Sequence, residues 1–192
     1  MQNRIKEILQ SSVDVKKSVM EDTQLLNRIE ETVNVIVKAF VDGKKVLFCG
    51  NGGSAADAQH LAAEFSGRFY YDRSPLDAEA LHVNSSYMTA VANDYSYDEV
   101  YSRLVKAKGV KGDVLVAIST SGNSSNILKA MQTSRELGMI NIGFTGATGG
   151  KMKDLSDVLL NIPSKDTPRI QESHITVGHI ICELVEAKLF PR

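Results

Sequence analysis

The chain has 192 residues, of which 43% are hydrophobic and 23% charged, and its formal net charge is −1. These values predict one globular domain with a substantial core and exclude disordered, collagen-like, coiled-coil and disulfide-rich chains. A net charge so close to zero offers no general attraction to nucleic acid or to an anionic membrane. The two cysteines, Cys49 and Cys182, lie in apolar segments, which is typical of buried free thiols in a cytoplasmic protein.

The first 42 residues have the apolar spacing of amphipathic helices. Two helices that meet near residues 21–23 fit this spacing, with Asp22 or Thr23 as the N-cap of the second. No apolar run here resembles a signal peptide, and none in the chain approaches the roughly 20 residues of a membrane span. We therefore expect a cytoplasmic protein with a helical hairpin over residues 1–42.

Residues 43–192 alternate short apolar runs with helix-like segments. In chain order the runs are KVLFCG, AEALHV, DVLVAIS, INIGFTG and DVLLNIP. Helical spacing is clearest over residues 54–67 and 124–138, and a long helical segment over 169–189 follows the last run. Alternating strands and helices predict a parallel sheet covered on both faces. The expected fold class is a single α/β domain, a three-layer sandwich with a five-stranded parallel sheet.

Two polar loops follow predicted strands, at the edge where parallel sheets bind their ligands. They are CGNGGS (residues 49–54) and STSGNS (residues 119–124). Glycines let backbone N–H groups approach an anion, and the helix after each loop adds a favourable dipole. Gly, Ser and Asn also make ordinary turns and caps, but two such loops together favour an anion site. Neither loop is a dinucleotide fingerprint or a Walker A loop.

Metal or catalytic ligands are offered by two of the predicted helices. His60 and Glu64 are four residues apart, so they share one helix face. This placement is compatible with a metal site and equally with an ordinary exposed His–Glu pair. The last helix carries Gln171 and His179, which are separated by about 12 Å of rise and about 80° of rotation in a straight helix. Spacing alone therefore leaves the metal site open.

A set of five motifs is specific enough to indicate a family. They are GNGGSAADAQHLAAEFSGRF, AVANDYSYDEVY, GDVLVAISTSGNSSNILKA, TGATGGKM and RIQESHITVGHIICELVE. Over essentially the whole chain, the sequence resembles the bacterial phosphoheptose isomerases of the sugar-isomerase (SIS) family. The resemblance implies a flavodoxin-like SIS fold, a cytoplasmic homotetramer and one Zn²⁺ per subunit. It also implies isomerisation of D-sedoheptulose 7-phosphate to D-glycero-D-manno-heptose 7-phosphate, for lipopolysaccharide or capsule synthesis.

The resemblance further implies roles for individual residues. The zinc ligands would be His60, Glu64, Gln171 and His179. The phosphosugar would be bound by Asn51, Gly52, Gly53, Glu64, Asn93, Asp94, Ser119, Thr120, Ser121, Ser124 and Gln171, with the four hydroxyl side chains holding the phosphate. Proton transfer between C1 and C2 needs a base and a second proton carrier, for which Glu64 and His179 are the candidates. Zn²⁺ would act as a Lewis acid.

The chain departs from its relatives at two places. Pro168 stands where some relatives have Asp, so any role of that carboxylate is missing. The segment FYYDRSPLDAEAL (residues 69–81) differs from relatives in length and composition, and no contacts are carried over to it.

Two non-enzymatic alternatives remain at this level. A related family of adaptors that associate with the bacterial replication initiator shares NGGSAA, QH and the RIQE region. That family lacks an acid at the position of Glu64, has Asn at that of His179 and has Arg at that of Ser121, so this sequence follows the enzymes. A phosphosugar-sensing regulator is the other alternative, but no attached helix-turn-helix is visible.

Overall fold

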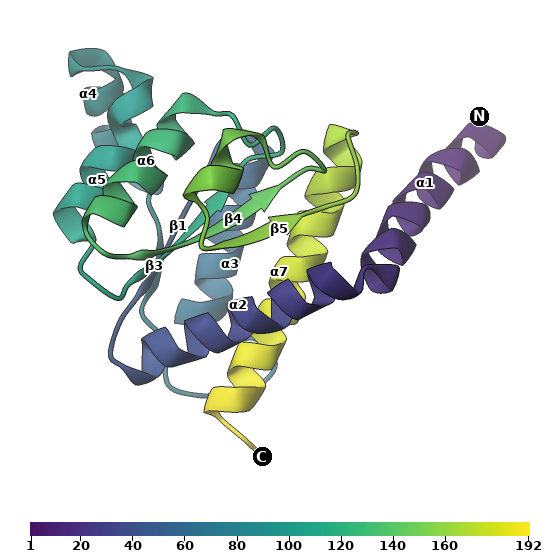
Figure 1. Cartoon of the computed structure of the whole chain (residues 1–192), viewed down its shortest axis with the longest axis horizontal. Coiled ribbons are helices and arrows are strands. Elements are labelled where there is room, and N and C mark those ends of the chain that lie inside the picture. Colours follow the sequence, from purple (N-terminus) through teal and green to yellow (C-terminus); the bar gives the residue numbers. More distant parts are fainter.

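A five-stranded parallel sheet forms the centre of the computed structural model, which describes all 192 residues (Figure 1). The strands are β1 (Val46–Gly50), β2 (Ala78–Ala80), β3 (Val114–Ile118), β4 (Ile140–Thr145) and β5 (Val158–Asn161). Their order across the sheet is β2-β1-β3-β4-β5, the flavodoxin-like order. The expected fold class is therefore confirmed.

Seven α-helices surround or extend from the sheet. They are α1 (Gln2–Glu21), α2 (Thr23–Val41), α3 (Gly53–Ser66), α4 (Ser85–Asp94), α5 (Val100–Lys108), α6 (Ser125–Glu136) and α7 (Thr167–Leu189). Two short 3₁₀ segments, η1 (Tyr97–Glu99) and η2 (Gly150–Leu155), complete the list. The helices expected from the spacing correspond to α3, α6 and α7, whereas α4 and α5 are additional. No helix is both long enough and apolar enough to span a bilayer.

Alternation along the strands separates two hydrophobic cores, because successive side chains face opposite sides of a sheet. Val46 and Phe48 of β1 pack on the side covered by α2, α3 and α7. Leu47 and Cys49 pack on the other side, which α5 and α6 cover. Fully burying one such side chain stabilises the fold by about 1.5–3 kcal/mol. The three-layer arrangement thus follows from strands that are apolar on both faces.

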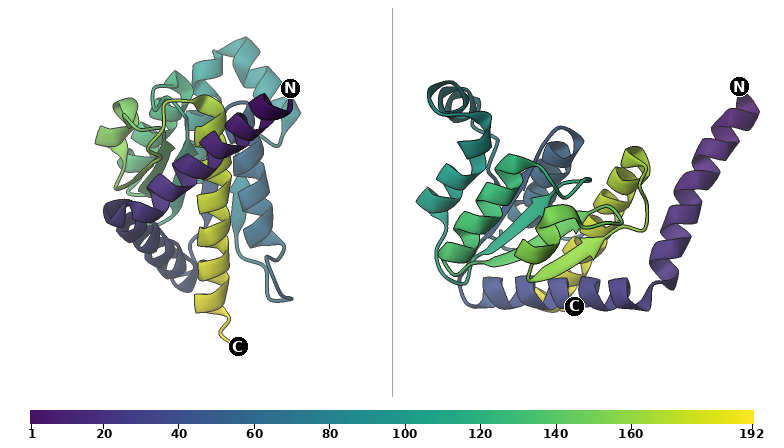
Figure 2. Two further views of the ribbon diagram at one scale, coloured as in Figure 1. Left: turned by 90° about the vertical axis from the view of Figure 1, so that its right-hand side faces the viewer. Right: turned by 45° about the horizontal axis from the view of Figure 1, so that its top comes forward.

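The N-terminus is helical as expected, but its two helices diverge instead of folding back on each other (Figure 2). Asp22 separates them, and its Oδ1 accepts a hydrogen bond from the Leu25 N–H at 3.0 Å, which caps α2. Within α1 only Val19 is buried, whereas α2 buries a full face against β5 and α7. The apolar side of α1, which includes Ile5 and Leu9, is exposed in the single chain.

Candidate metal centre and phosphosugar site

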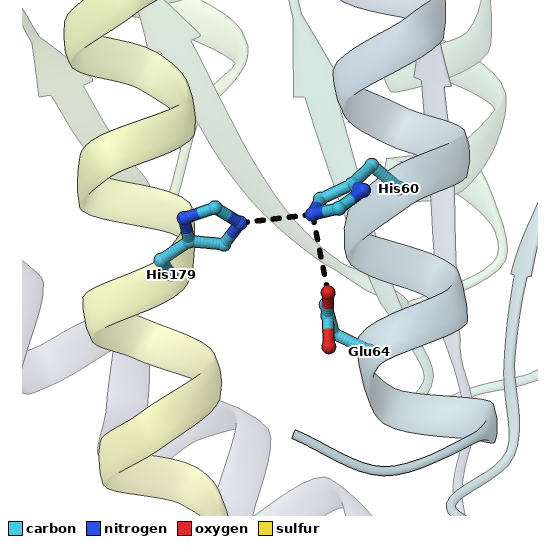
Figure 3. Close-up of side chains that lie close together, drawn as sticks. All are labelled: His60, Glu64 and His179. Carbon is cyan, nitrogen blue, oxygen red and sulfur yellow. Dashed lines mark hydrogen bonds and ion pairs between the residues drawn. The ribbon is translucent and has the colours of Figure 1, made fainter. Parts of the chain in front are cut away.

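Three side chains capable of binding a metal converge between α3 and α7 (Figure 3). His60 and Glu64 come from α3, and His179 comes from α7. The Nε2 atom of His60 lies 2.9 Å from Nε2 of His179 and 3.1 Å from Oε1 of Glu64. One ligand atom from each residue lies within 4.8 Å of the others. The structure therefore brings together three of the four predicted metal ligands.

Close packing of the two helices produces this convergence. Gly178 precedes His179 on α7, and a Cβ at Gly178 would lie 2.6 Å from a methyl carbon of Leu61, the neighbour of His60 on α3. A larger residue at Gly178 would therefore push the helices apart at the level of the cluster. Gly178 is thus part of the reason that two imidazoles from distant segments meet.

The donor set fits a divalent metal ion. Zinc binds imidazole nitrogen and carboxylate oxygen at about 2.0–2.2 Å, so its tetrahedral ligand atoms lie about 3.3 Å apart. The separations of 2.9 Å and 3.1 Å around His60 are close to that value. The His60 side chain is 50% exposed and that of Glu64 is 21% exposed, which leaves the cluster open to an incoming ion. Two imidazoles and a carboxylate suit zinc and other divalent transition metals.

Gln171, the fourth predicted ligand, lies against the start of α3. A Cβ at Gly53, the first residue of α3, would lie 2.6 Å from Nε2 of Gln171. Gly53 precedes His60 by seven residues, which is about 10 Å of helix rise. The Gln171 amide therefore lies beside the loop that contains Asn51 and Gly52.

The second predicted loop presents a row of hydroxyl groups after β3. Oγ of Ser119 lies 3.1 Å from Oγ of Ser124 and 3.4 Å from Oγ of Ser121. Thr120 follows the buried Ser119 and lines a hollow of about 280 Å³ together with Ser121 and residues of the loops after β4 and β5. Hydroxyls grouped in this way before a helix can donate hydrogen bonds to phosphate oxygens.

Backbone packing holds the hydroxyl loop in place. Gly122 has a φ of +66°, and a Cβ there would lie 2.2 Å from the carbonyl oxygen of Gly149. The Gly122 carbonyl accepts from the Met152 N–H at 3.0 Å, and the Asn123 side chain accepts from the Lys151 N–H at 3.0 Å. The TGATGGKM segment therefore supports the hydroxyl loop from behind.

Asn51 and Asn126 join the two loops through a reciprocal amide pair. Each side-chain amide donates to the other residue's Oδ1 at 2.9 Å, and the Tyr97 hydroxyl donates to Oδ1 of Asn51 at 3.2 Å. Asn126 is buried on the first turn of α6, whereas Asn51 follows β1. Sequence reasoning missed Asn126 and Tyr97, because their spacing gives no signal of contact with Asn51.

Asn93 and Asp94 are exposed at the C-terminal end of α4. The Asn93 amide donates to Oδ1 of Asp94 at 2.9 Å. No hydrogen bond joins either side chain to the two loops or to the His60 cluster within the chain.

Asp57 adds a charge-sensitive group one turn before His60. Burial raises the pKa of Asp57 to about 6, and the positive charge of a protonated His60 acts in the opposite direction. Its Oδ2 is buried without a hydrogen-bond partner. The carboxyl group therefore ionises less readily than an exposed aspartate.

Known proteins resemble this chain in sequence and in fold. The SIS domain family model matches residues 10–146. A phosphoheptose isomerase of Aneurinibacillus thermoaerophilus is 52% identical over 190 residues, which cover 99% of this chain and 96% of that protein. One of Clostridium acetobutylicum is 50% identical, with 99% and 97% covered. The solved structure of phosphoheptose isomerase from Neisseria gonorrhoeae matches with a TM-score of 0.91 at 40% identity, covering 97% of this chain and 98% of that one. The chain therefore belongs to the phosphoheptose isomerases, a family of SIS-domain enzymes.

Proposed function

We propose that the chain isomerises D-sedoheptulose 7-phosphate to D-glycero-D-manno-heptose 7-phosphate, as a step in bacterial heptose biosynthesis for lipopolysaccharide or capsule. The observation that carries the proposal is the convergence of His60, Glu64 and His179 in a chain of this family. These side chains combine a carboxylate and two imidazoles, which are the groups that aldose–ketose proton transfer requires.

In the proposed mechanism, Glu64 removes the proton from the carbon beside the carbonyl and returns it to the neighbouring carbon. His179 exchanges the second proton between the two oxygens through Nδ1, the ring nitrogen that ligation of a metal by Nε2 would leave free. Oε1 of Glu64 faces His60, so Oε2 is the oxygen that remains for proton transfer. Zinc, when bound by these residues, supplies Lewis-acid stabilisation of the negative charge on the enediolate.

The hydroxyl loop anchors the phosphate in this proposal through Ser119, Thr120, Ser121 and Ser124. The grouping of their side chains after β3 supports the assignment. Asn51, Gly52 and Gly53 line the sugar phosphate from the neighbouring loop, with Asn93, Asp94, Glu64 and Gln171 as further sugar contacts. The Gln171 amide already lies against Gly53, which supports its contact with substrate.

We further propose a cytoplasmic homotetramer with one zinc ion per subunit. Exposed apolar residues on α1, α2 and α7 support the assembly, since the single chain leaves them uncovered. Gln171 is the proposed fourth zinc ligand. Its amide lies beside Gly53 within one chain, so the side chain would have to turn away from Gly53 to complete the ligand set.

Turnover of sedoheptulose 7-phosphate is the experiment that tests the proposal. The assay compares protein as purified, metal-stripped protein and protein reloaded with Zn²⁺. We expect activity in the first and third samples and its loss in the second. Binding of the sugar phosphate without turnover in zinc-loaded protein would favour a regulator, and binding of the replication initiator without turnover would favour an adaptor.

A further inference from the structure

A buried ion pair joins Arg73, in the loop after α3, to Glu186 on α7. Nε of Arg73 lies 3.0 Å from Oε1 of Glu186, and the two side chains are only 2% and 1% exposed. Burying two charges is costly unless both are fully hydrogen-bonded. The remaining hydrogen bonds of this pair therefore indicate what the pair holds in place.

Arg73 binds the last carbonyl groups of α3. Its guanidinium donates to the carbonyl oxygens of Glu64 at 2.8 Å, Phe65 at 2.7 Å and Gly67 at 3.1 Å. Carbonyls in the last turn of a helix have no partner within the helix, and helix ends fray when such groups are left unpaired. Glu64 stands in this turn, so Arg73 fixes the backbone of a proposed metal ligand.

Glu186, on α7, binds the loop that follows α3. It lies seven residues after His179, which is two helical turns and therefore the same face of α7. Its carboxylate accepts hydrogen bonds from the N–H groups of Phe69 at 3.0 Å and Tyr70 at 2.8 Å. The Phe69 ring consequently lies 5.8 Å from the His179 imidazole, measured between ring centroids.

The Glu186 carboxylate remains ionised in this setting. Burial alone would raise its pKa, but the hydrogen bonds from Tyr70 and Phe69 and the charge of Arg73 outweigh burial and lower the pKa. At neutral pH the negative charge of Glu186 on α7 thus faces the positive charge of Arg73 at the end of α3.

We infer that Arg73 and Glu186 are positioning residues for the metal centre, an inference that rests on the proposed function. Neither forms a hydrogen bond with the side chains of His60, Glu64 or His179; Arg73 contacts only the Glu64 backbone. Together they tie the last turn of α3 to α7 and hold Phe69 against His179. Metal ligands must be placed to within a few tenths of an ångström, so loosening this tie displaces Glu64 relative to His179 and weakens metal binding.

Two conservative variants and one matched control test the inference. Glu186→Gln keeps the size of the side chain and an oxygen acceptor for the backbone but removes the charge, and Arg73→Lys keeps the charge but loses the planar fork. The control is Asp113→Asn, directly before β3. Asp113 is equally buried, accepts from the N–H groups of Lys45 and Val110, and pairs with the Lys45 ammonium at 2.6 Å, and neither partner belongs to α3 or α7.

Zinc affinity, measured by competition with a chromogenic chelator, separates positioning from general stability. We expect the zinc Kd of Glu186→Gln and Arg73→Lys to rise about 10–100-fold. The Asp113→Asn variant should lose thermal stability but keep its zinc Kd within about twofold of wild type. The visible spectrum of the cobalt-substituted protein should change in the first two variants and not in the control.

The inference would be overturned if Glu186→Gln and Arg73→Lys both kept wild-type zinc affinity and an unchanged cobalt spectrum while their melting temperatures fell like that of the control. The proposed function would not be affected by that result. Should one variant not fold, the other still decides the point. Failure of the wild-type chain to bind zinc would instead overturn the proposed function, and the inference with it.

Discussion

The Nε2 atoms of His60 and His179 lie 2.9 Å apart although the residues are separated by 119 positions in the chain. At that distance the two rings share a hydrogen bond, in which Nε2 of one ring carries the hydrogen and Nε2 of the other accepts it. A cation bound by both rings replaces this shared proton. Metal binding through both Nε2 atoms therefore requires the donor ring to carry its hydrogen on Nδ1 instead.

The first prediction concerns this metal centre. Chelation should abolish turnover and added Zn²⁺ should restore it, because the proposed reaction needs charge stabilisation beside the carbonyl. His60→Ala should lower both the zinc content, measured by elemental analysis, and turnover. Full activity in protein shown to be free of metal would contradict the prediction.

The second prediction concerns proton transfer. Glu64→Gln and His179→Asn should each lower kcat by at least about 100-fold at saturating zinc, since a positioned acid or base contributes about 10²–10⁴-fold. Binding of sedoheptulose 7-phosphate should persist, because the proposed phosphate anchor is the separate hydroxyl loop. Glu183→Gln, an exposed acid one turn beyond His179, is the control and should keep wild-type kcat. A variant of Glu64 or His179 with normal kcat would remove that residue from the mechanism.

The third prediction concerns the amide pair between the two loops. Asn126→Ala removes both hydrogen bonds to Asn51 and should raise KM about tenfold with little change in kcat, because it disturbs binding geometry and not the reacting groups. Asn141→Ala is the matched control. The Asn141 amide donates to the carbonyls of Met131 and Leu155, so its loss should reduce stability and leave KM unchanged. Equal KM effects of the two substitutions would count against a specific role of Asn126.

The fourth prediction concerns acid stability. Burial lowers the pKa of His174 from 6.5 to about 4, although its hydrogen bond to the Thr145 carbonyl, 3.0 Å from Nε2, acts the other way. The Nδ1 atom has no partner, so protonation would bury an unpaired N–H. Because the unfolded chain binds more protons between pH 6.5 and about pH 4, this contribution is complete above pH 6.5 and is lost as the pH falls toward 4.

His174→Gln tests that prediction, since Gln keeps a donor for Thr145 but does not titrate. The free energy of unfolding of wild type minus that of the variant should fall by up to about 3 kcal/mol between neutral pH and about pH 4, in urea titrations. Asp57, whose raised pKa of about 6 has the opposite effect, is present in both proteins and cancels. A pH-independent difference would contradict the assignment.

The fifth prediction concerns assembly. Ile180 and Leu184 on α7 are 40% and 42% exposed and border a groove that also includes Met20 and Leu26. Leu184→Glu should reduce the mass of the proposed tetramer, measured by light scattering at micromolar concentration, because it places a charge in an apolar contact. Val110→Glu, at an exposed site between α5 and β3, should leave the mass unchanged. A monomeric wild-type chain with full activity would contradict the prediction.

Local pattern was sufficient to predict the sheet. Each strand is a short apolar run closed by small or polar residues, and β1 and β3 are buried on both faces, as such runs indicate. Helical period predicted that His60 and Glu64 share a face. It could not predict that His179 meets them, because that depends on the close contact of Gly178 with Leu61 across two helices.

Contacts that depend on three-dimensional packing were beyond the sequence. The divergence of α1 from α2 reflects the absence of a buried face on α1, although the apolar spacing of the two helices looks alike. Arg73 and Glu186 read as ordinary charged residues in the sequence, where such residues are usually solvated. Only the folded chain reveals that both are buried.

The 119 positions between His60 and His179 affect when the metal centre can form during synthesis. A nascent chain that lacks α7 carries His60 and Glu64 but no second imidazole, and it also lacks Glu186. Protein domains are made from the N-terminus, so metal capture by all three ligands must follow docking of the final helix. A metal held by all three ligands would therefore stabilise only chains in which α7 has docked, and it could not act as an early nucleus for folding.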